Sequence, residues 1–412
     1  MNKFLKRAQE LEASMKSDRH YLHQNAEVGF DLPITTKYVM DRLQEIGLEP
    51  KEICKSGVTA LIEGKKPGKT YLLRADMDAL SMNEENVLEF ASKTNAAHNC
   101  GHDMHTAILL GAAQILKENV DELEGNVRLM FQPNEEAFLG SKAMIEAGVL
   151  DDVDVASCMH MMLDYDASNY ACAPGFFSSS CDGFKITVNG KGCHGAMPHL
   201  GIDPINVGMS ICTAFQQLVS RETPPKETAS LTFGQFSGGN TPNIVPDKVV
   251  IQGTLRTYNA ELRAKLVNRM QTIVKSAGEM YGTTVEYEVL SDVPSIYVNP
   301  EMLEEVKTYL SEIEGLTLAN DNFRITPSDD MAFISEKVPT VYLLLQSTIK
   351  HLAIARPLGT SLSTIKISPL LAKQDGLSVY LTTSPSVEIN LELTTIYFPV
   401  SFMSFSCALP FS

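Results

Sequence analysis

The sequence has no excess of basic residues. Its 34 Lys and Arg residues are outnumbered by 50 Asp and Glu residues, which gives a formal net charge of −16 at pH 7. Because a nucleic-acid partner requires a basic face, this balance argues against nucleic acid as a partner. An anionic ligand would also need a local cation to attract it against the overall field of the protein.

Long apolar runs and paired cysteines are also missing. No apolar run follows the charged residues of positions 1–20, so we expect neither a signal peptide nor an import sequence. The eight cysteines are scattered, which favours reduced thiols in a cytoplasmic protein over a disulfide framework. Near the C-terminus, Pro399 and Pro410 interrupt the apolar stretch, which is unlike a membrane-spanning helix. The sequence therefore predicts no membrane partner.

The length of 412 residues predicts two domains. In residues 1–180, helical and strand patterns alternate, which predicts a mainly parallel α/β/α sheet domain. The predicted helices are 1–17, 35–46, 106–117 and 142–147, and the predicted strands are 59–62, 71–74 and 127–131.

A different rhythm follows in residues 181–295. The order of the predicted elements is strand, helix, strand, strand, helix, strand, which is the ferredoxin-like βαββαβ plan. These elements are 184–188, 204–220, 230–236, 248–258, 260–281 and 284–290. We therefore predict an α/β protein whose first domain is interrupted by a smaller one. The chain is expected to return to the first domain over 296–345, and 346–412 forms an atypical tail rich in Ser, Thr and Leu.

The segment His98-Asn99-Cys100-Gly101-His102-Asp103-Met104-His105 carries a thiol and three imidazoles. Cys100 and His102 are two residues apart, and Gly101 lets the backbone bend so that both can point at one metal ion. One alternative is that these side chains cap the following helix. Another is a Cys/His nucleophile pair, although such partners normally lie far apart in sequence.

Adjacent carboxylates, Glu135 and Glu136, follow the predicted strand 127–131. This places them at the carboxyl edge of the sheet, where α/β proteins build their sites. One of them can bind a metal while the other acts as a general base on a bound water. The alternative is a solvated acidic turn.

Three further residues complete the candidate site. His160 closes an apolar run at a predicted strand end, although a single histidine there is usually structural. Asp76 follows another apolar strand and can orient a ligand histidine through a hydrogen bond. Asp103, inside the histidine-rich segment, is assigned to the same supporting role.

Together these motifs resemble the aminoacylase-like dinuclear metallopeptidase family, most closely its N-acyl-amino-acid amidohydrolases, with hippurate hydrolase and the plant auxin-conjugate hydrolases. The motifs stand in family order, and they are RADMDAL (74–80), HNCGHDMH (98–105), QPNEE (132–136), His160, GKGCHGA (190–196), TPNIVP (241–246) and GTLR (253–256).

The resemblance implies two divalent metal ions (manganese, zinc or cobalt). It assigns Cys100 as the thiolate that bridges them and His102, Glu136 and His160 as further ligands. Glu135 is implied as the general base that deprotonates a metal-bridging water and later protonates the leaving amine.

A second group of implied roles falls in the inserted domain, which the family uses for dimerisation. His194 is implied to reach a neighbouring subunit's site and stabilise the oxyanion, so a homodimer is expected. Asn243 and Arg256 are implied to hold the substrate carboxylate, and a planar guanidinium suits that task. For Arg256, an ordinary surface salt bridge is the alternative.

The implied activity is hydrolysis of the amide bond of an N-acyl amino acid or short peptide. A metallo-carboxypeptidase or dipeptidase is the nearest alternative, but those branches usually have Asp in place of Cys100. A catalytically impaired homodimer is the other, because the tail lacks the family's C-terminal ligand histidine and His351 comes too early. We hypothesise that 346–412 is the family's C-terminus read in another frame, or otherwise replaced.

Overall fold

The computed structural model describes residues 3–86, 88–166 and 168–348, and these form two compact units. One unit comprises Met1–Gly175, Tyr297–Arg324 and the chain from Phe333, and the other comprises Phe176–Ile296 and Ile325–Ala332. The predicted α/β class is confirmed. Most of the atypical tail, and with it the frame-shift hypothesis, lies outside the described residues.

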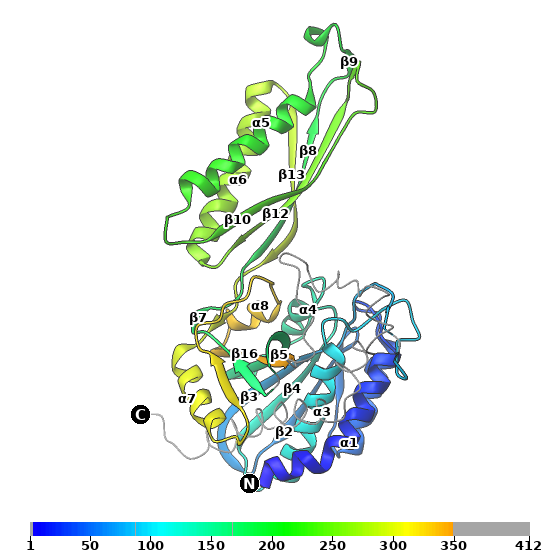
Figure 1. Ribbon diagram of the computed structural model, residues 1–412, viewed down its shortest axis with the longest axis vertical. Coiled ribbons are helices and arrows are strands. Elements are labelled where there is room, and N and C mark those ends of the chain that lie inside the picture. Colours follow the sequence, from blue (N-terminus) through cyan, green and yellow to red (C-terminus); the bar gives the residue numbers. More distant parts are fainter. Residues whose placement is uncertain (1–2, 87, 167, 349–412) are drawn as a thin grey trace, which may run out of the picture. The chain divides into compact units, whose positions relative to one another are not determined.

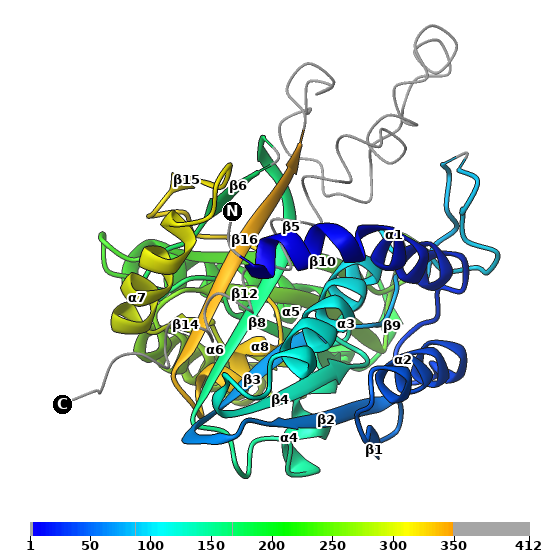
Figure 2. The ribbon, with the colours of Figure 1, turned by 90° about the horizontal axis from the view of Figure 1, so that it is seen from below.

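The first unit is built on a mixed eight-stranded sheet with the order β1-β2-β4-β3-β5-β16-β6-β15. Its central strands β4, β3, β5 and β16 run parallel, whereas β1 and β2 are antiparallel additions at one edge (Figure 2). The strands are β1 (Lys51–Cys54), β2 (Gly57–Glu63), β3 (Lys66–Asp76), β4 (Glu124–Gln132), β5 (Val155–Asp166), β6 (Asn169–Ala171), β15 (Thr317–Asn320) and β16 (Thr340–Thr348).

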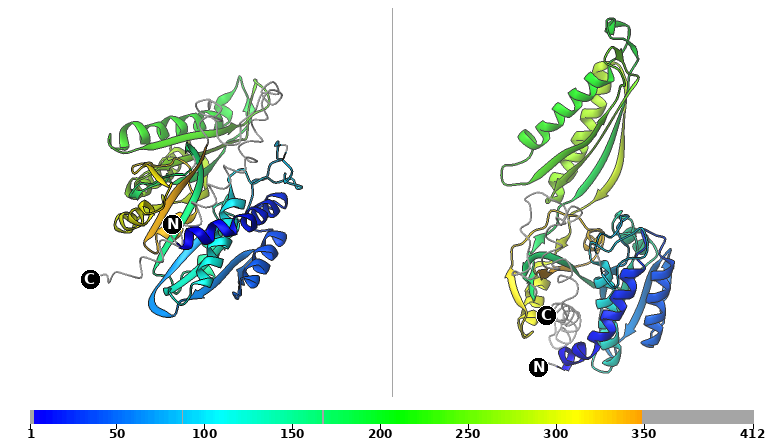
Figure 3. Two further views of the ribbon diagram at one scale, coloured as in Figure 1. Left: turned by 60° about the horizontal axis from the view of Figure 1, so that its bottom comes forward. Right: turned by 45° about the vertical axis from the view of Figure 1, so that its right-hand side comes forward.

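Helices cover this sheet. α1 (Lys3–Gln24) packs on α3 (His102–Glu118), which packs on β3 (Figure 3). Most of α3 is buried, because it lies between the sheet and α1. The other helices that contact this sheet are α2 (Pro33–Glu45) on β2, α4 (Gly140–Glu146) on β1 and β4, and α7 (Pro300–Ser311) on β16. Within the described ranges, no helix combines the length and apolar character that crossing a membrane would require.

Two of the differences between the predicted and the observed elements involve candidate site residues. The helix expected to start at Thr106 begins at His102, because Gly101 adopts a left-handed φ of 89° and turns the chain into the helix. His160 was expected at the end of a strand, but it lies inside β5. The strand continues past it because β16 pairs alongside, with Leu344 opposite His160 and Gln346 opposite Met162.

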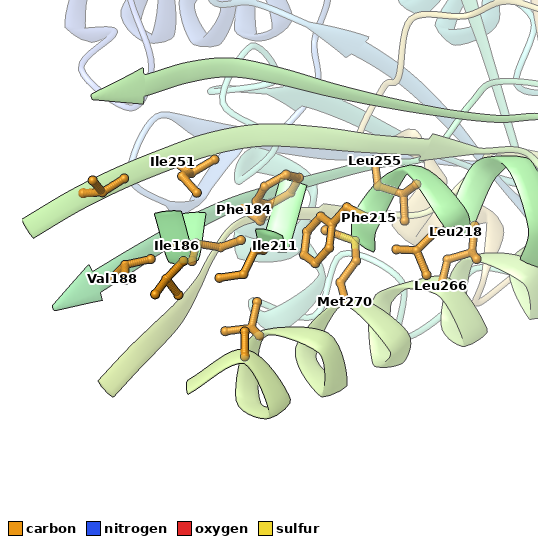
Figure 4. Packing of buried hydrophobic residues seen from close by; sticks show 14 of the residues in the cluster. Phe184, Ile186, Val188, Ile211, Phe215, Leu218, Ile251, Leu255, Leu266 and Met270 are labelled. Atoms are coloured by element: carbon orange, nitrogen blue, oxygen red, sulfur yellow. The ribbon is translucent and has the colours of Figure 1, made fainter. Parts of the chain in front are cut away.

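The second unit has the βαββαβ order, with an antiparallel sheet in the order β10-β12-β8-β13. Both helices pack on one face of it (Figure 1), around Phe184, Phe215 and Met270 (Figure 4). Asp203 and Asn259 cap the helix N-termini through their side chains. The elements are β8 (Cys181–Asn189), α5 (Pro204–Gln217), β10 (Ala229–Ser237), β12 (Lys248–Thr257), α6 (Ala260–Tyr281) and β13 (Thr284–Val293).

Short elements complete the chain. β9 (Cys193–His194) pairs with β11 (Ile244–Val245), while Pro198–Leu200 and Leu218–Glu222 form single helical turns. β7 (Gly175–Phe176), β14 (Tyr297–Val298) and α8 (Met331–Ser335) lie where the chain passes between the units in sequence.

Candidate metal centre

Four segments of the first unit converge near the carboxyl end of β3. β3 and β4 are parallel neighbours with Asp76 opposite Gln132, so the segments that follow them leave the sheet at the same edge. α3, which begins at His102, packs on β3, and β5 carries His160 on the other side of β3. The topology therefore brings together residues that lie far apart in the sequence.

The potential ligand atoms of these segments form overlapping groups within 4.8 Å of one another, and His102 belongs to three of them. The Sγ atom of Cys100 lies 3.4 Å from Nε2 of His160. Nε2 of His102 lies 3.9 Å from Oε1 of Glu136 and 4.0 Å from Oε2 of Glu135. The three groups that contain His102 are Cys100–His102–His160, Asp76–His102–His105 and His102–Glu135–Glu136.

Two histidines are oriented so that Nε2 faces this cluster. Nδ1 of His102 donates to the backbone oxygen of Asp78 at 2.8 Å, and Nδ1 of His160 donates to the backbone oxygen of Met161 at 2.7 Å. A proton fixed on Nδ1 leaves the lone pair on Nε2, which is the form that binds a metal ion.

Buried polar atoms at the centre test whether a cation fits. Nε2 of His102 and Oε1 of Glu136 are both buried, and neither has a hydrogen-bond partner among the described residues. Leaving such an atom unsatisfied costs about 1–3 kcal/mol. A divalent ion between them would satisfy both atoms, and Cys, His and Glu are suitable donors for zinc, manganese and cobalt. The residues present therefore fit a metal site.

His105 belongs to the same cluster, but both of its ring nitrogens are engaged. Nδ1 lies 2.6 Å from Oδ1 of Asp76, and Nε2 accepts the backbone N–H of Met161 at 3.0 Å. With its acceptor nitrogen used by β5, His105 acts as a brace between β3 and β5. We conclude that it supports the ligands and does not serve as one in this geometry.

Asp76 is held in a buried ion pair. Nη1 of Arg74 donates to its Oδ2 at 2.7 Å, and both side chains are fully buried. Burial raises the pKa of Asp76, but the charge of Arg74 and the hydrogen bond from His105 lower it, and the pKa lies well below its usual range. Nε of Arg74 also donates to Oε1 of Gln132 at the end of β4. The predicted support by Asp76 is thus directed at His105.

Asp78 organises the turn that carries the two glutamates. Its Oδ1 accepts the backbone N–H of Glu135 at 3.0 Å, and its Oδ2 accepts that of Glu136 at 3.2 Å. Asn134, which precedes them, has a left-handed φ of 52°. Burial raises the pKa of Glu136. Asp78 therefore links the end of β3 to the predicted base and the predicted ligand.

The surroundings of Cys100 favour its protonated thiol. Burial raises the pKa of this thiol, although His102 opposes the shift. Because the thiolate is the form that binds metal, metal uptake should release a proton and strengthen as the pH rises.

The remaining predicted residue of this region, Asp103, makes its hydrogen bonds to residues outside the cluster. Its Oδ2 lies 2.8 Å from Nδ1 of His23 and accepts from Nε of Arg19 at 3.3 Å. These bonds connect α3 to α1 and do not reach a candidate ligand.

The other three predicted residues lie in the second unit. His194 pairs with Ile244 across the β9–β11 ribbon, and the backbone N–H of Gly195 donates to the oxygen of Asn243 at 2.8 Å. His194 and Asn243 are therefore neighbours, and both are exposed. Arg256 lies in β12, and its Nη1 donates to Oγ of Ser328 at 3.1 Å.

Asp78 and His105 were not assigned from the sequence. Asp78 is two positions after Asp76, so strand-like alternation would have placed both on one side. His105 is three positions after His102, which puts both on one face of a helix. Both spacings can be read from the sequence. The spacing of His102 and His105 was missed because the helix was predicted to begin only at Thr106.

The chain is similar to known proteins over the region that contains these segments. A family model described as peptidase family M20/M25/M40 matches residues 72–354, a range that contains the whole cluster. Thermostable carboxypeptidase 2 of Saccharolobus solfataricus is 37% identical over 333 residues, which are 79% of this chain and 84% of the relative. The N-acyl-L-amino acid amidohydrolase of Geobacillus stearothermophilus is 40% identical over 272 residues, which are 65% of this chain and 74% of the relative.

A solved structure shares the fold as well. The YXEP protein of Bacillus subtilis, described as a dinuclear metal binding peptidase of the M20 family, superposes with a TM-score of 0.72 at 26% identity. The match covers 95% of this chain and 99% of that chain.

Proposed function

The chain belongs to peptidase family M20/M25/M40 and is a metal-dependent hydrolase, and from this premise we propose that it hydrolyses the amide bond of N-acyl amino acids. The N-acyl-L-amino acid amidohydrolase among its relatives supports this substrate class. The observation that carries the proposal is the pair of unpartnered buried atoms, Nε2 of His102 and Oε1 of Glu136, beside Glu135.

Two divalent ions, of manganese, zinc or cobalt, would be held by Cys100, His102, Glu136 and His160. When bound, such ions lower the pKa of an attacking water and polarise the scissile carbonyl, each effect contributing several kcal/mol. The hydrogen bonds of His102 and His160 through Nδ1 would leave Nε2 of each ring as the atom that binds an ion. Asp76 and Asp78 keep the segments on either side of the ligands in place.

Glu135 is the general base of the proposed reaction. Its side chain is almost buried, and its backbone is fixed by Asp78, so its carboxylate is held beside His102. It takes a proton from the water as the oxygen–carbon bond forms. It then delivers that proton to the amide nitrogen as the carbon–nitrogen bond breaks. The products are a carboxylic acid and a free amino group.

The inserted domain, 181–295, is proposed to form a homodimer. Around His194 it exposes Met197 (44%), Leu200 (53%) and Ile244 (55%), and exposed apolar groups that cluster mark interaction surfaces. In the dimer, His194 would donate to the oxyanion in the partner's site, while Asn243 and Arg256 would hold the substrate carboxylate.

Mixing two inactive variants tests this arrangement. A Glu135→Gln protomer keeps His194, and a His194→Ala protomer keeps Glu135. If His194 acts across the dimer, a mixed dimer contains one complete site, and activity should return on mixing. Mass spectrometry shows whether mixed dimers have formed. If they have formed and the mixture is still inactive, His194 does not act across the dimer.

The central experiment counts metals and measures turnover. The purified chain is stripped, reloaded with manganese, cobalt or zinc, and assayed with benzoyl-glycine and acetyl-methionine. Two ions per chain with turnover support the proposal. If the chain binds none of the three ions and shows no turnover, the remaining explanation is a catalytically impaired homodimer. The impairment would then be attributed to the ligand histidine that the tail lacks.

Carboxypeptidase or dipeptidase activity is the second candidate, because thermostable carboxypeptidase 2 is a relative. Blocked peptides with a free C-terminus and unblocked dipeptides, assayed beside the N-acyl amino acids, separate the two. A higher kcat/KM for peptides would favour this candidate.

A cytoplasmic location remains part of the proposal. Its support is that the seven cysteines in the described ranges are all unpaired, as a reducing compartment requires.

A further inference from the structure

A second buried cluster of polar side chains lies at the first turn of α3, and its residues are distinct from the candidate metal ligands. Its centre is His23, near the end of α1, whose Nδ1 lies 2.8 Å from Oδ2 of Asp103. Asp103 is next to the predicted ligand His102 in the sequence. His23 therefore contacts the helix turn that positions a metal ligand.

The other ring nitrogen of His23 reaches a different part of the chain. Its Nε2 lies 3.1 Å from Oε1 and 3.2 Å from Oε2 of Glu84. Oε2 of Glu84 in turn accepts the backbone N–H of Ser92 at 2.6 Å. With a carboxylate on each side, His23 donates from both nitrogens and joins α3 to the segment that contains Glu84 and Ser92.

That segment, 77–101, connects β3 to α3 and carries two residues of the candidate site. It begins beside Asp78, which fixes the glutamate turn, and it ends with Cys100 and the turn glycine Gly101. Its described residues contain no helix or strand longer than the single bridge between Leu80 and Ala97. A connection of this length without regular structure needs specific contacts to stay in one conformation.

Burial makes the contacts at His23 strong. The side chains of His23, Glu84 and Asp103 are 8%, 3% and 1% exposed. Phe90 of the segment stacks on His20 at a ring distance of 3.8 Å and meets the edge of the His23 ring at 5.4 Å. Burial lowers the pKa of His23, but the hydrogen bonds and charges of Asp103 and Glu84 outweigh it and raise the pKa. A charged imidazole between two carboxylates forms two charge-assisted bonds.

We propose that His23 is a positioning residue of the metal centre, which acts by joining the first turn of α3 to the middle of the segment that ends in Cys100. The inference rests on the proposed function, because it assumes that Cys100 and His102 bind metal. Residues that orient metal ligands from outside typically change metal affinity by 10–100-fold when removed. His23 contacts no candidate ligand itself, so its effect must pass through Asp103 and Glu84.

Three substitutions at one position separate the two halves of this bridge. His23→Ala removes both bonds, His23→Asn keeps a donor near the position of Nδ1, and His23→Gln keeps one near the position of Nε2. As a matched control, Asp18→Asn weakens another buried contact of α1, the pair with Arg42 at 2.8 Å, which links α1 to α2.

Affinity for Mn²⁺ and Zn²⁺ is measured by titration of the stripped full-length chain, and hydrogen exchange of 77–101 is measured in the metal-free protein. We expect His23→Ala to weaken metal binding by about 10–100-fold and to speed exchange at Leu80, Ser92 and Ala97. His23→Asn and His23→Gln should each bind more weakly than the unsubstituted chain, because each loses one end of the bridge. Asp18→Asn should bind metal normally.

The contrary results are equally distinct. If His23→Ala binds metal within twofold of the unsubstituted chain while losing stability as Asp18→Asn does, His23 is only structural and the inference is wrong. If His23→Asn or His23→Gln binds metal normally, the two contacts of His23 are not both needed, and the proposed bridge between Asp103 and Glu84 is wrong. If the unsubstituted chain binds no metal, the proposed function is wrong. Hydrogen exchange then still shows whether His23 holds segment 77–101 in place, because faster exchange in His23→Ala does not depend on metal.

Discussion

The first turn of α3 separates two buried clusters of histidines and carboxylates that differ in how their polar atoms are satisfied. On one side, His102 and Glu136 each bury an atom without a hydrogen-bond partner in the described chain. On the other side, His23 engages both ring nitrogens with Asp103 and Glu84. Both clusters contain histidines and carboxylates, although the Glu136 side chain is 25% exposed and the side chains of His23, Glu84 and Asp103 are at most 8% exposed.

This difference indicates which cluster is built to bind something. Protein interiors rarely leave polar atoms unsatisfied, so an unsatisfied pair aimed at one point indicates a place for a cation. The contacts with Asp103 and Glu84 use both ring nitrogens of His23, so His23 holds segments together and has no nitrogen left for a ligand. His105 shows that the distinction applies within one cluster, because it lies among the candidate ligands and yet has both nitrogens engaged.

Removing the proposed base should have the largest effect. Glu135→Gln keeps the size of the side chain but cannot accept a proton, so kcat should fall by about 10²–10⁴-fold while metal content stays unchanged. Steady-state kinetics and metal analysis on the same sample check this. Retained turnover would mean that another group is the base.

Breaking the buried ion pair beneath the cluster should destabilise the fold. Arg74→Ala leaves the carboxylate of Asp76 buried without its partner, which costs about 3–5 kcal/mol. Denaturant unfolding of the metal-free chain measures the loss. The doubly substituted Arg74→Leu, Asp76→Leu chain is the control, and it should recover part of that stability because no charge remains buried.

Two histidines on the same helix should respond differently. His102→Ala removes a proposed ligand and should weaken metal binding by more than about 100-fold. His105→Asn, which keeps a donor toward Asp76, should change metal affinity by less than about tenfold. Titration with Zn²⁺ compares them. An equal loss in both variants would contradict the assignment of His105 as a brace.

A smaller effect is expected from pH. The folded-state pKa of His23 is raised above its ordinary value of 6.5, so its stabilisation is fully present below pH 6.5 and is lost as the pH rises through the folded-state pKa. Unfolding free energy of the metal-free chain should therefore decline from pH 6 towards pH 9, and more steeply than in His23→Gln. Parallel curves for the two proteins would contradict a charged His23.

The sequence predicted most of the fold because its elements are strongly patterned. α6, at Ala260–Tyr281, has the predicted limits, and its ends carry an asparagine cap and Gly282 in the left-handed conformation. The family resemblance, carried by short motifs, is confirmed by the family match. The end of β5 was misplaced because partner strands, not local sequence, decide where a strand stops.

Part of the site was less accessible to sequence reasoning. Cys100 and His102 are close in sequence, so their spacing alone suggested a shared site, and their metal roles stay predictions. His23 gave no such signal, because its partners Asp103 and Glu84 are 80 and 61 positions away. Contacts of that kind follow from the way α1 packs on α3, which no local pattern encodes.

The position of β16 in the sheet has a consequence for how the protein is made. β16 lies beside β5, with Leu344 opposite His160, yet the ribosome synthesises the whole second unit between these two strands. A nascent chain that has just completed β5 therefore exposes an unpaired strand edge that carries a proposed ligand. During this interval, chaperone binding or early folding of the second unit would protect that edge from aggregation.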